Sequence, residues 1–176
     1  MTNRLLFISC ALAGCAPSEG GLQLSYGLYR SDGTTPARNC FDIQVSQIRV
    51  VIGNDDNRNM QLEDEEMIGR ALADCNQSDA DQNGQLSLAD LGRFETPSDR
   101  LPTGEFNTML IQLTGIDGGD VPVRFHASPN GFSNGGVVFY STSVAALFEI
   151  KEGEITQFSF SGFMGGFQEA RFVTNR

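Results

Sequence analysis

The sequence predicts a mainly β protein, an antiparallel β-sandwich that carries a small helical insert. Three observations predict this class. Apolar and polar residues alternate in a series of short segments, which is the period of half-buried strands. Gly, Asn, Asp and Pro fill the stretches between those segments. Residues 62–94 interrupt the series and begin with helical spacing. A chain of 176 residues fits one such domain.

The first strands are expected at residues 22–29 and within residues 40–52. In the first segment Leu22, Leu24, Tyr26 and Leu28 alternate with Gln23, Ser25, Gly27 and Tyr29. In the second, Ile43 and Val45 share one parity, and Ile48, Val50 and Ile52 share the other. This change of phase at Ser46-Gln47 predicts a β-bulge, or a strand bent between two sheets.

From Gly104 onward the alternation returns in a regular series. The expected strands contain Met109, Ile111 and Leu113; Val121, Val123, Phe125 and Ala127; Val137 to Tyr140; Ala146 to Ile150; and Ile155 to Phe163. Most Phe residues alternate with polar ones, which assigns them to the core. The last apolar residues, Phe163, Phe167, Phe172 and Val173, either close the core or present an apolar patch to a partner.

One stretch of this series resembles a known kind of sandwich. Gly104-Glu105-Phe106, an alternating strand and then Asp117-Gly118 are similar to the central strand of transthyretin-like and carboxypeptidase-regulatory-like domains. The resemblance covers residues 104–118. It implies an Ig-like or transthyretin-like arrangement of the sheets.

The insert is expected to begin with a helix. Leu62, Met67, Ile68, Ala71, Leu72 and Cys75 fall at helical spacing. Glu63, Asp64, Glu65 and Glu66 precede or overlap the first turn, where carboxylates favour the positive end of the helix dipole.

The N-terminus carries a targeting signal. A short cationic start, an apolar run and small residues occupy positions 1–15. Leu12-Ala13-Gly14-Cys15 resembles the lipobox of bacterial lipoproteins, which implies cleavage after Gly14 and acylation of Cys15. An ordinary secretory signal with a chance Cys is the alternative. In the lipoprotein interpretation, residues 1–14 are the signal peptide, residues 15–21 are the lipidated Cys and a short tether, and residues 22–176 form a single domain. Ala16 after the Cys implies, in a Gram-negative cell, anchoring at the outer membrane.

Two cysteines remain in the exported domain, Cys40 and Cys75. Because the compartment outside the cytoplasm is oxidising, they are expected to form a disulfide. Closing a loop of about 36 residues contributes roughly 4 kcal/mol in the chain-entropy model.

The insert also contains a candidate metal site. Asp79, Asp81 and Asn83 alternate, Gly84 follows, and Gln85, Ser87 and Asp90 complete twelve positions with the apolar Leu86 at the eighth. This order resembles the calcium loop of EF-hand and dockerin proteins, which implies a calcium site formed by Asp79, Asp81, Asn83, Gln85, Ser87 and Asp90. Gln85 would act through its backbone carbonyl, and Asp at the last position is the dockerin variant. A solvated acidic turn and a thrombospondin-type calcium repeat are the alternatives. With one such loop, we expect a structural ion of weak affinity, about 10⁻⁴–10⁻³ M.

Charge and motifs exclude several functions. The formal net charge is -10, so a nucleic-acid partner is not expected. Gly131-Phe-Ser133-Asn-Gly135 has the spacing of a hydrolase nucleophile elbow, but the only His, His126, precedes it, whereas that fold places its His later. The residues therefore form no recognisable catalytic set.

The sequence thus predicts a non-enzymatic, calcium-stabilised lipoprotein of the cell envelope, serving in binding, adhesion or envelope assembly. Its expected contacts are the membrane, through acyl chains on Cys15, and an envelope protein or surface ligand. A secreted hydrolase or hydrolase-accessory domain, acting through Ser133 or carboxylates, is the alternative from another class. A protease-inhibitor or ligand-binding sandwich is a third.

Overall fold

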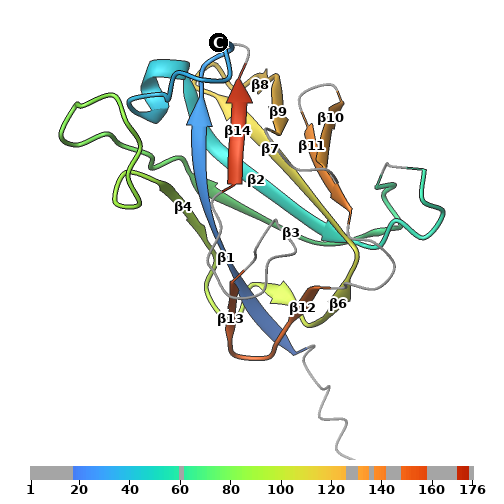
Figure 1. Cartoon of the computed structure of the whole chain (residues 1–176). Helices are drawn as coiled ribbons and strands as arrows, with labels where there is room; N and C mark the ends of the chain where they lie inside the picture. Colours follow the sequence, from blue (N-terminus) through green and yellow to red (C-terminus); the bar gives the residue numbers. More distant parts are fainter. Residues whose placement is uncertain are drawn as a thin grey trace, which may run out of the picture.

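A computed structural model describes residues 18–59, 62–125, 131–134, 137–141, 148–157 and 170–174, and it confirms a mainly β protein (Figure 1). The predicted signal peptide, Cys15 and His126 lie outside these residues. In the described part of the chain, no helix is long and apolar enough to cross a membrane. The strands are β1 (Glu19–Tyr29), β2 (Val45–Gly53), β3 (Met67–Asp74), β4 (Gly92–Glu95), β5 (Leu101–Pro102), β6 (Gly104–Phe106), β7 (Thr108–Gly115), β8 (Asp120–Val121), β9 (Val123–Phe125), β10 (Gly131–Asn134), β11 (Val137–Ser141), β12 (Phe148–Ile150), β13 (Ile155–Gln157) and β14 (Ala170–Thr174), and the 3-10 helix η1 spans Cys40–Ile43.

The first sheet is built around the long strand β1. On one edge β1 pairs with β4 and β5, both antiparallel. On the other edge it pairs with β13 and then β14, both parallel, and β9 follows β14. The expectation of purely antiparallel pairing is therefore wrong for β1. Parallel partners need long connections, and β13 and β14 come from the far end of the chain.

β1 also begins earlier than predicted, at Glu19 within the expected tether. Gly20 and Gly21 allow this because neighbouring backbone approaches them closely. A Cβ on Gly20 would lie 2.1 Å from the carbonyl oxygen of Lys151, and one on Gly21 would lie 2.9 Å from that of Pro97. A side chain at either position would push these segments away from β1.

The second sheet has the order β10-β11-β7-β2-β3, with β8 also on β7, and its pairs are antiparallel. The pairing of β2 with β7 shifts between Val45 and Gln47, which confirms the bulge predicted from the phase change. Ser46 stabilises the irregularity, because its Oγ donates to the carbonyl oxygens of Thr114 (3.1 Å) and Gly115 (2.9 Å). A small third sheet pairs β12 with β6.

Both large sheets contribute to one buried cluster. Its members from the first sheet include Leu22, Leu24, Tyr26, Leu28, Phe94 and Phe172, and those from the second include Ile48, Val50, Ile52, Met109, Ile111 and Leu113. The alternation seen in the sequence therefore marks the core face correctly in β1, β2 and β7. Phe172 and Val173 are buried as well, so the C-terminal strand closes the core.

Two predicted elements are wrong. Residues 40–43 form η1 instead of a strand, with the Asn39 side chain accepting from the backbone N–H of Asp42 (2.8 Å). The expected helix from residue 62 is absent over Met67–Asp74, where the chain forms β3.

The helical prediction failed because the spacing of the large apolar residues was misleading. The residues of β3 that face the core are small: Gly69, Ala71 and Ala73. At Gly69 a Cβ would come within 2.9 Å of Pro102 Cδ, so β5 leaves no room for a larger side chain. Ile68 and Leu72 point outward and are 46% and 53% exposed. A strand with a narrow inner gap thus has its small residues inside and its large ones outside.

Candidate metal centre

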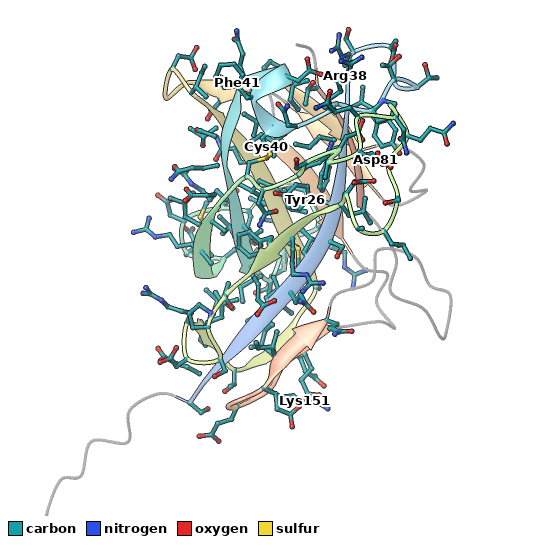
Figure 2. The ribbon with its side chains drawn as sticks, turned by 90° about the vertical axis from the view of Figure 1, so that its left-hand side faces the viewer. Tyr26, Arg38, Cys40, Phe41, Asp81 and Lys151 are labelled. Carbon is teal, nitrogen blue, oxygen red and sulfur yellow. A yellow bond between two sulfur atoms is a disulfide. The ribbon has the colours of Figure 1, made fainter. Side chains whose placement is uncertain are left out.

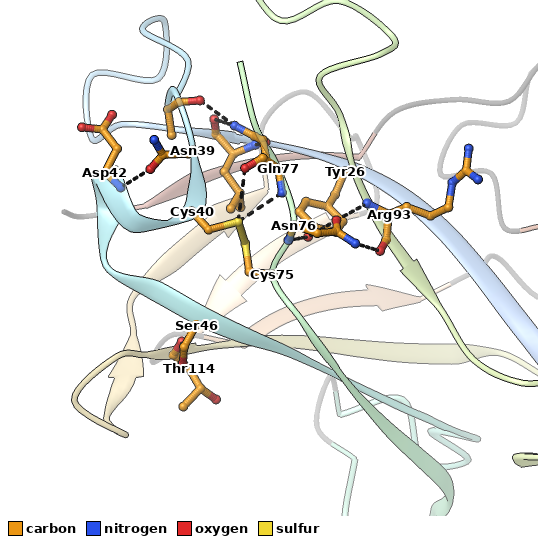
Figure 3. The surroundings of a disulfide bond; sticks show 12 residues. Tyr26, Asn39, Cys40, Asp42, Ser46, Cys75, Asn76, Gln77, Arg93 and Thr114 are labelled. Carbon is orange, nitrogen blue, oxygen red and sulfur yellow. Dashed lines mark hydrogen bonds between the residues drawn. A yellow bond between two sulfur atoms is a disulfide. The ribbon is translucent and has the colours of Figure 1, made fainter. Parts of the chain in front are cut away.

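The predicted calcium loop lies in the connection from β3 to β4. Just after β3 the chain is fastened to η1 by the disulfide between Cys40 and Cys75, which confirms that pairing (Figure 3). The loop entrance is tied further, because the N–H of Asp79 donates to the carbonyl oxygen of Arg38 (2.6 Å). Figure 2 shows Arg38 and Asp81 at the same end of the molecule as Cys40.

Gln77 anchors the same connection inside the core. Its side chain accepts from the N–H of Leu28 (2.6 Å) and donates to the carbonyl oxygen of Ala37 (2.7 Å). Only 2% of Gln77 is exposed. The loop therefore starts from a rigid support two residues before its first carboxylate, which keeps that carboxylate in place.

Three of the predicted ligands converge. Asp79, Asp81 and Asp90 each place a carboxylate oxygen within 4.8 Å of the others. Asp79 and Asp90 are buried, whereas Asp81 is exposed. Like charges at this separation repel, and a cation between them removes the repulsion.

Backbone N–H groups hold the first carboxylate. Asp79 Oδ1 accepts from Asn83 N (3.2 Å), and Oδ2 accepts from Gly84 N (2.8 Å). The chain turns sharply there, with φ of 56° at Gln82 and 74° at Gly84. A Cβ added at position 84 would have no atom within 4 Å, so a side chain would meet no neighbour there. Glycine is favoured because the backbone has a positive φ at this position.

Ser87 organises the last carboxylate. Its N–H donates to Asp90 Oδ2 (2.9 Å), and its Oγ donates to the same oxygen (2.5 Å). These hydrogen bonds lower the pKa of Asp90 below its ordinary value. Asp90 is therefore ionised under ordinary conditions and available to a cation.

The other predicted ligands contact their neighbours in the loop. Asn83 Nδ2 donates to Asp81 Oδ2 (2.8 Å), and Asn83 Oδ1 accepts from Gln85 N (2.7 Å). Ser87 contacts the site through Asp90. Asn83 would have to rotate its side-chain amide to direct Oδ1 at a cation. The carboxylates of Asp79, Asp81 and Asp90 already converge on one point.

A second loop with the same order was missed at the level of sequence. Asp55, Asn57, Asn59, Glu63 and Glu66 occupy the positions that Asp79, Asp81, Asn83, Ser87 and Asp90 occupy in the first loop, and Leu62 matches Leu86. The spacing could have revealed it. Met60 stands where the first loop has Gly84, and the acidic run 63–66 also fits the start of a helix.

The hydrogen bonds of the two loops correspond. Asn59 N donates to Asp55 Oδ1 (3.2 Å), as Asn83 N does to Asp79. Glu63 N donates to Glu66 Oε2 (3.1 Å), as Ser87 N does to Asp90. Arg58 has φ of 56°, the value found at Gln82. Asp55, like Asp79, is buried.

The two loops bracket the same strand. Residues 55–66 connect β2 to β3 and residues 79–90 connect β3 to β4, so they lie at opposite ends of β3 (Figure 1). An eight-residue strand separates them, a length of roughly 25 Å. They are therefore two separate loops and not a face-to-face pair.

Ser133, the candidate nucleophile, lies in β10 and is paired with Val138 of β11. A nucleophile elbow needs a turn between a strand and a helix, and this backbone is extended.

Comparison with protein-family models, with curated proteins and with solved structures finds no match for this chain.

Proposed function

We propose that this chain is a non-enzymatic, lipid-anchored protein of the bacterial cell envelope that binds calcium at the loop 79–90. The convergence of the Asp79, Asp81 and Asp90 carboxylates within 4.8 Å is the observation that carries the calcium part. Calcium prefers several oxygen ligands in a flexible arrangement, and this loop supplies charged oxygens at one point. The resemblance to EF-hand and dockerin loops supports the same ion.

The order of residues and two matching hydrogen bonds extend the proposal to the loop 55–66, although among the described residues only Asp79, Asp81 and Asp90 already converge. Two ions, one at each end of β3, would hold that strand against β2, its one partner in the part of the chain that the structure describes. Calcium then has a structural role. It stabilises the fold without being turned over or transported.

The first test is thermal unfolding of the purified full chain with and without calcium. An ion bound at about 10⁻⁴ M and supplied at about one hundred times that level adds roughly 2.7 kcal/mol. For a chain of this size we expect Tm to rise by about 5–10 °C. Magnesium at the same concentration should raise Tm less, because it loses its water shell reluctantly.

Two variants locate the effect. Asp79→Asn together with Asp81→Asn should remove the contribution of loop 79–90 to the rise in Tm. The matched control is Asp99→Asn, which neutralises an exposed carboxylate outside both loops and should leave the rise unchanged. An equal calcium response in the double variant and the control would eliminate this site.

The lipid anchor is carried by Leu12-Ala13-Gly14-Cys15. The disulfide supports export, because disulfides persist in oxidising compartments. Two or three acyl chains hold a protein durably in a membrane, which agrees with the processing that the lipobox implies. With β1 starting at Glu19, the domain would lie close to the outer membrane, its proposed location.

Metabolic labelling with a radioactive fatty acid in a bacterial host tests the anchor. The full chain should take up label and fractionate with membranes, and Cys15→Ser should abolish both. Cys10→Ser is the control, since it removes a neighbouring thiol and leaves the lipobox intact. Label retained by Cys15→Ser would contradict the anchor.

The Ig-like or transthyretin-like type of sandwich also belongs to this proposal. Two sheets that share one buried cluster support a sandwich. The binding or adhesion role then falls to the outer surfaces of these sheets, toward an envelope protein or surface ligand.

A further inference from the structure

β3 is an edge strand of the second sheet. In the described part of the chain β3 pairs with β2 alone. Cys75 N donates to Ser46 O, so the odd-numbered residues from Gly69 to Cys75 direct their backbone polar groups toward β2. The N–H and C=O groups of Arg70, Leu72 and Asp74 consequently point to the open edge. An edge of this kind is a template for another strand.

Space is present beside this edge. A hollow of about 290 Å³ lies between β3 and the segment from β4 to β5. Arg70 and Leu72 line it from β3, and Thr96, Pro97 and Arg100 line it from the other side. The segment from β4 to β5 therefore lies across a gap from this edge and does not pair with it.

The outward side chains of β3 have a self-complementary order. Arg70, Leu72 and Asp74 are a cation, an apolar group and an anion on one face, and all three are exposed. When a second β3 is placed antiparallel with Leu72 opposite Leu72, Arg70 of each copy lies opposite Asp74 of the other. Opposite charges and apolar pairs in facing positions stabilise paired strands.

Natural edge strands are commonly protected by charged side chains, especially Lys, by Pro or by a bulge, whereas β3 carries two charges of opposite sign, Arg70 and Asp74. The irregularity in the pairing of β2 and β3 lies at Ile52/Gly53, outside the segment from Arg70 to Asp74. Arg49, Arg70 and Arg100 lie around the edge of a chain whose net charge is -10. Arg70 and Arg100 form no ion pair with another described residue.

We infer that β3 is a homodimer interface, in which two copies pair edge to edge about a two-fold axis at Leu72. The second sheets of the two copies then form one continuous sheet. The surface is isologous, since the same residues serve on both sides. This inference does not depend on calcium binding or on the lipid anchor.

Sedimentation velocity of the purified full chain tests the interface. At about 100 µM, where an interface of micromolar affinity is occupied, the wild-type chain should be dimeric. Arg70→Asp places Asp opposite Asp, and Asp74→Arg places Arg opposite Arg. Each variant alone should raise the dimer Kd by about tenfold or more, because both facing pairs become repulsive.

Mixing the two variants is the decisive step. In the mixture, the aspartate introduced at position 70 of one chain faces the arginine introduced at position 74 of the other. The second pair joins the native Asp74 of the first chain to the native Arg70 of the other, so the dimer should return. Recovery on mixing also shows that both variants are folded. The double variant Arg70→Asp/Asp74→Arg should dimerise like the wild type, since it exchanges the charges.

Cross-linking checks the register. Leu72→Cys should form a disulfide between copies, because directly opposite residues in a hydrogen-bonded pair lie about 5.5 Å apart. Ile68→Cys is the control, since in this register its two copies lie roughly 27 Å apart. A monomeric wild type at this concentration, dimers unaffected by either charge change, or equal cross-linking at both positions would each overturn the inference.

Discussion

Single side chains connect the candidate loop to the core, and Tyr26 is the clearest example. Its hydroxyl donates to Asn76 Oδ1 (3.0 Å) and accepts from Asn76 N (2.9 Å), as Figure 3 shows. The Asn76 side chain also donates to Arg93 O (2.9 Å) and accepts from Arg93 N (2.7 Å). Gly92 lies against the ring, since a Cβ there would be 2.1 Å from it. One buried phenol thus joins both ends of the 79–90 connection to β1.

The ionisation of Tyr26 yields a prediction for stability at high pH. Burial raises its pKa to about 12, against about 10 in the unfolded chain. Folding therefore favours the neutral phenol, and this contribution is complete below pH 10 and is lost as the pH rises toward 12. The loss amounts to about 2.7 kcal/mol. Denaturant unfolding across this pH range should show it.

Tyr26→Phe is the matched variant. It should be less stable at neutral pH by about 1–2 kcal/mol, because the N–H of Asn76 loses its acceptor. Its stability should then change less than that of the wild type between pH 10 and 12. A parallel decline in both proteins would contradict the assignment to Tyr26.

At the scale of elements, β3 determines the candidate site. The loop 79–90 was predictable from the sequence, because Asp79, Asp81 and Asp90 are close together in the chain and only local backbone geometry is needed to bring them to one point. The loop 55–66 was missed, since the same carboxylates also fit the first turn of a helix. Only the pairing of β3 with β2 decides between a helix and a strand for Met67–Asp74. Such pairing joins residues distant in sequence, and local spacing does not contain it.

The number of calcium ions per chain tests the two-loop arrangement. Titration calorimetry should give two ions for the wild type. Asp55→Asn together with Glu66→Gln should leave one, because these residues occupy the first and last positions of the loop 55–66.

Asp64→Asn with Glu65→Gln is the control, since it removes two exposed charges from positions that are not ligands in the resemblance. It should still bind two ions. A wild type that binds a single ion would confine the site to loop 79–90.

At the scale of the whole molecule, strands from the two ends of the described chain pair with each other. β1 is near the start of the described chain and pairs with β13 and β14 from its end. The disulfide adds a second closure, joining η1 to the end of β3 across 35 positions. The pairing of distant segments through β1 therefore holds the first sheet, and the crosslink fixes the end of β3 beside η1.

Removal of the disulfide should be costly. Cys40→Ala with Cys75→Ala should lower the free energy of unfolding by about 4 kcal/mol, because the unfolded chain regains the freedom of the open loop. Denaturant unfolding at neutral pH measures this. Ser46→Ala, which removes only side-chain hydrogen bonds at the bulge, should cost about 1 kcal/mol. A double cysteine variant as stable as the wild type would show that the core alone holds η1 and β3 together.

The sequence by itself determined the β class, the buried faces of β1, β2 and β7, the bulge, the cysteine pairing and the order of carboxylates in loop 79–90. These features depend on neighbouring residues, on side-chain alternation or on the few cysteines present. Tertiary structure alone decided that β13 and β14 join β1 in parallel and that residues 67–74 are a strand. Each of these depends on which distant backbone comes to lie alongside, and that is set by packing across the whole core.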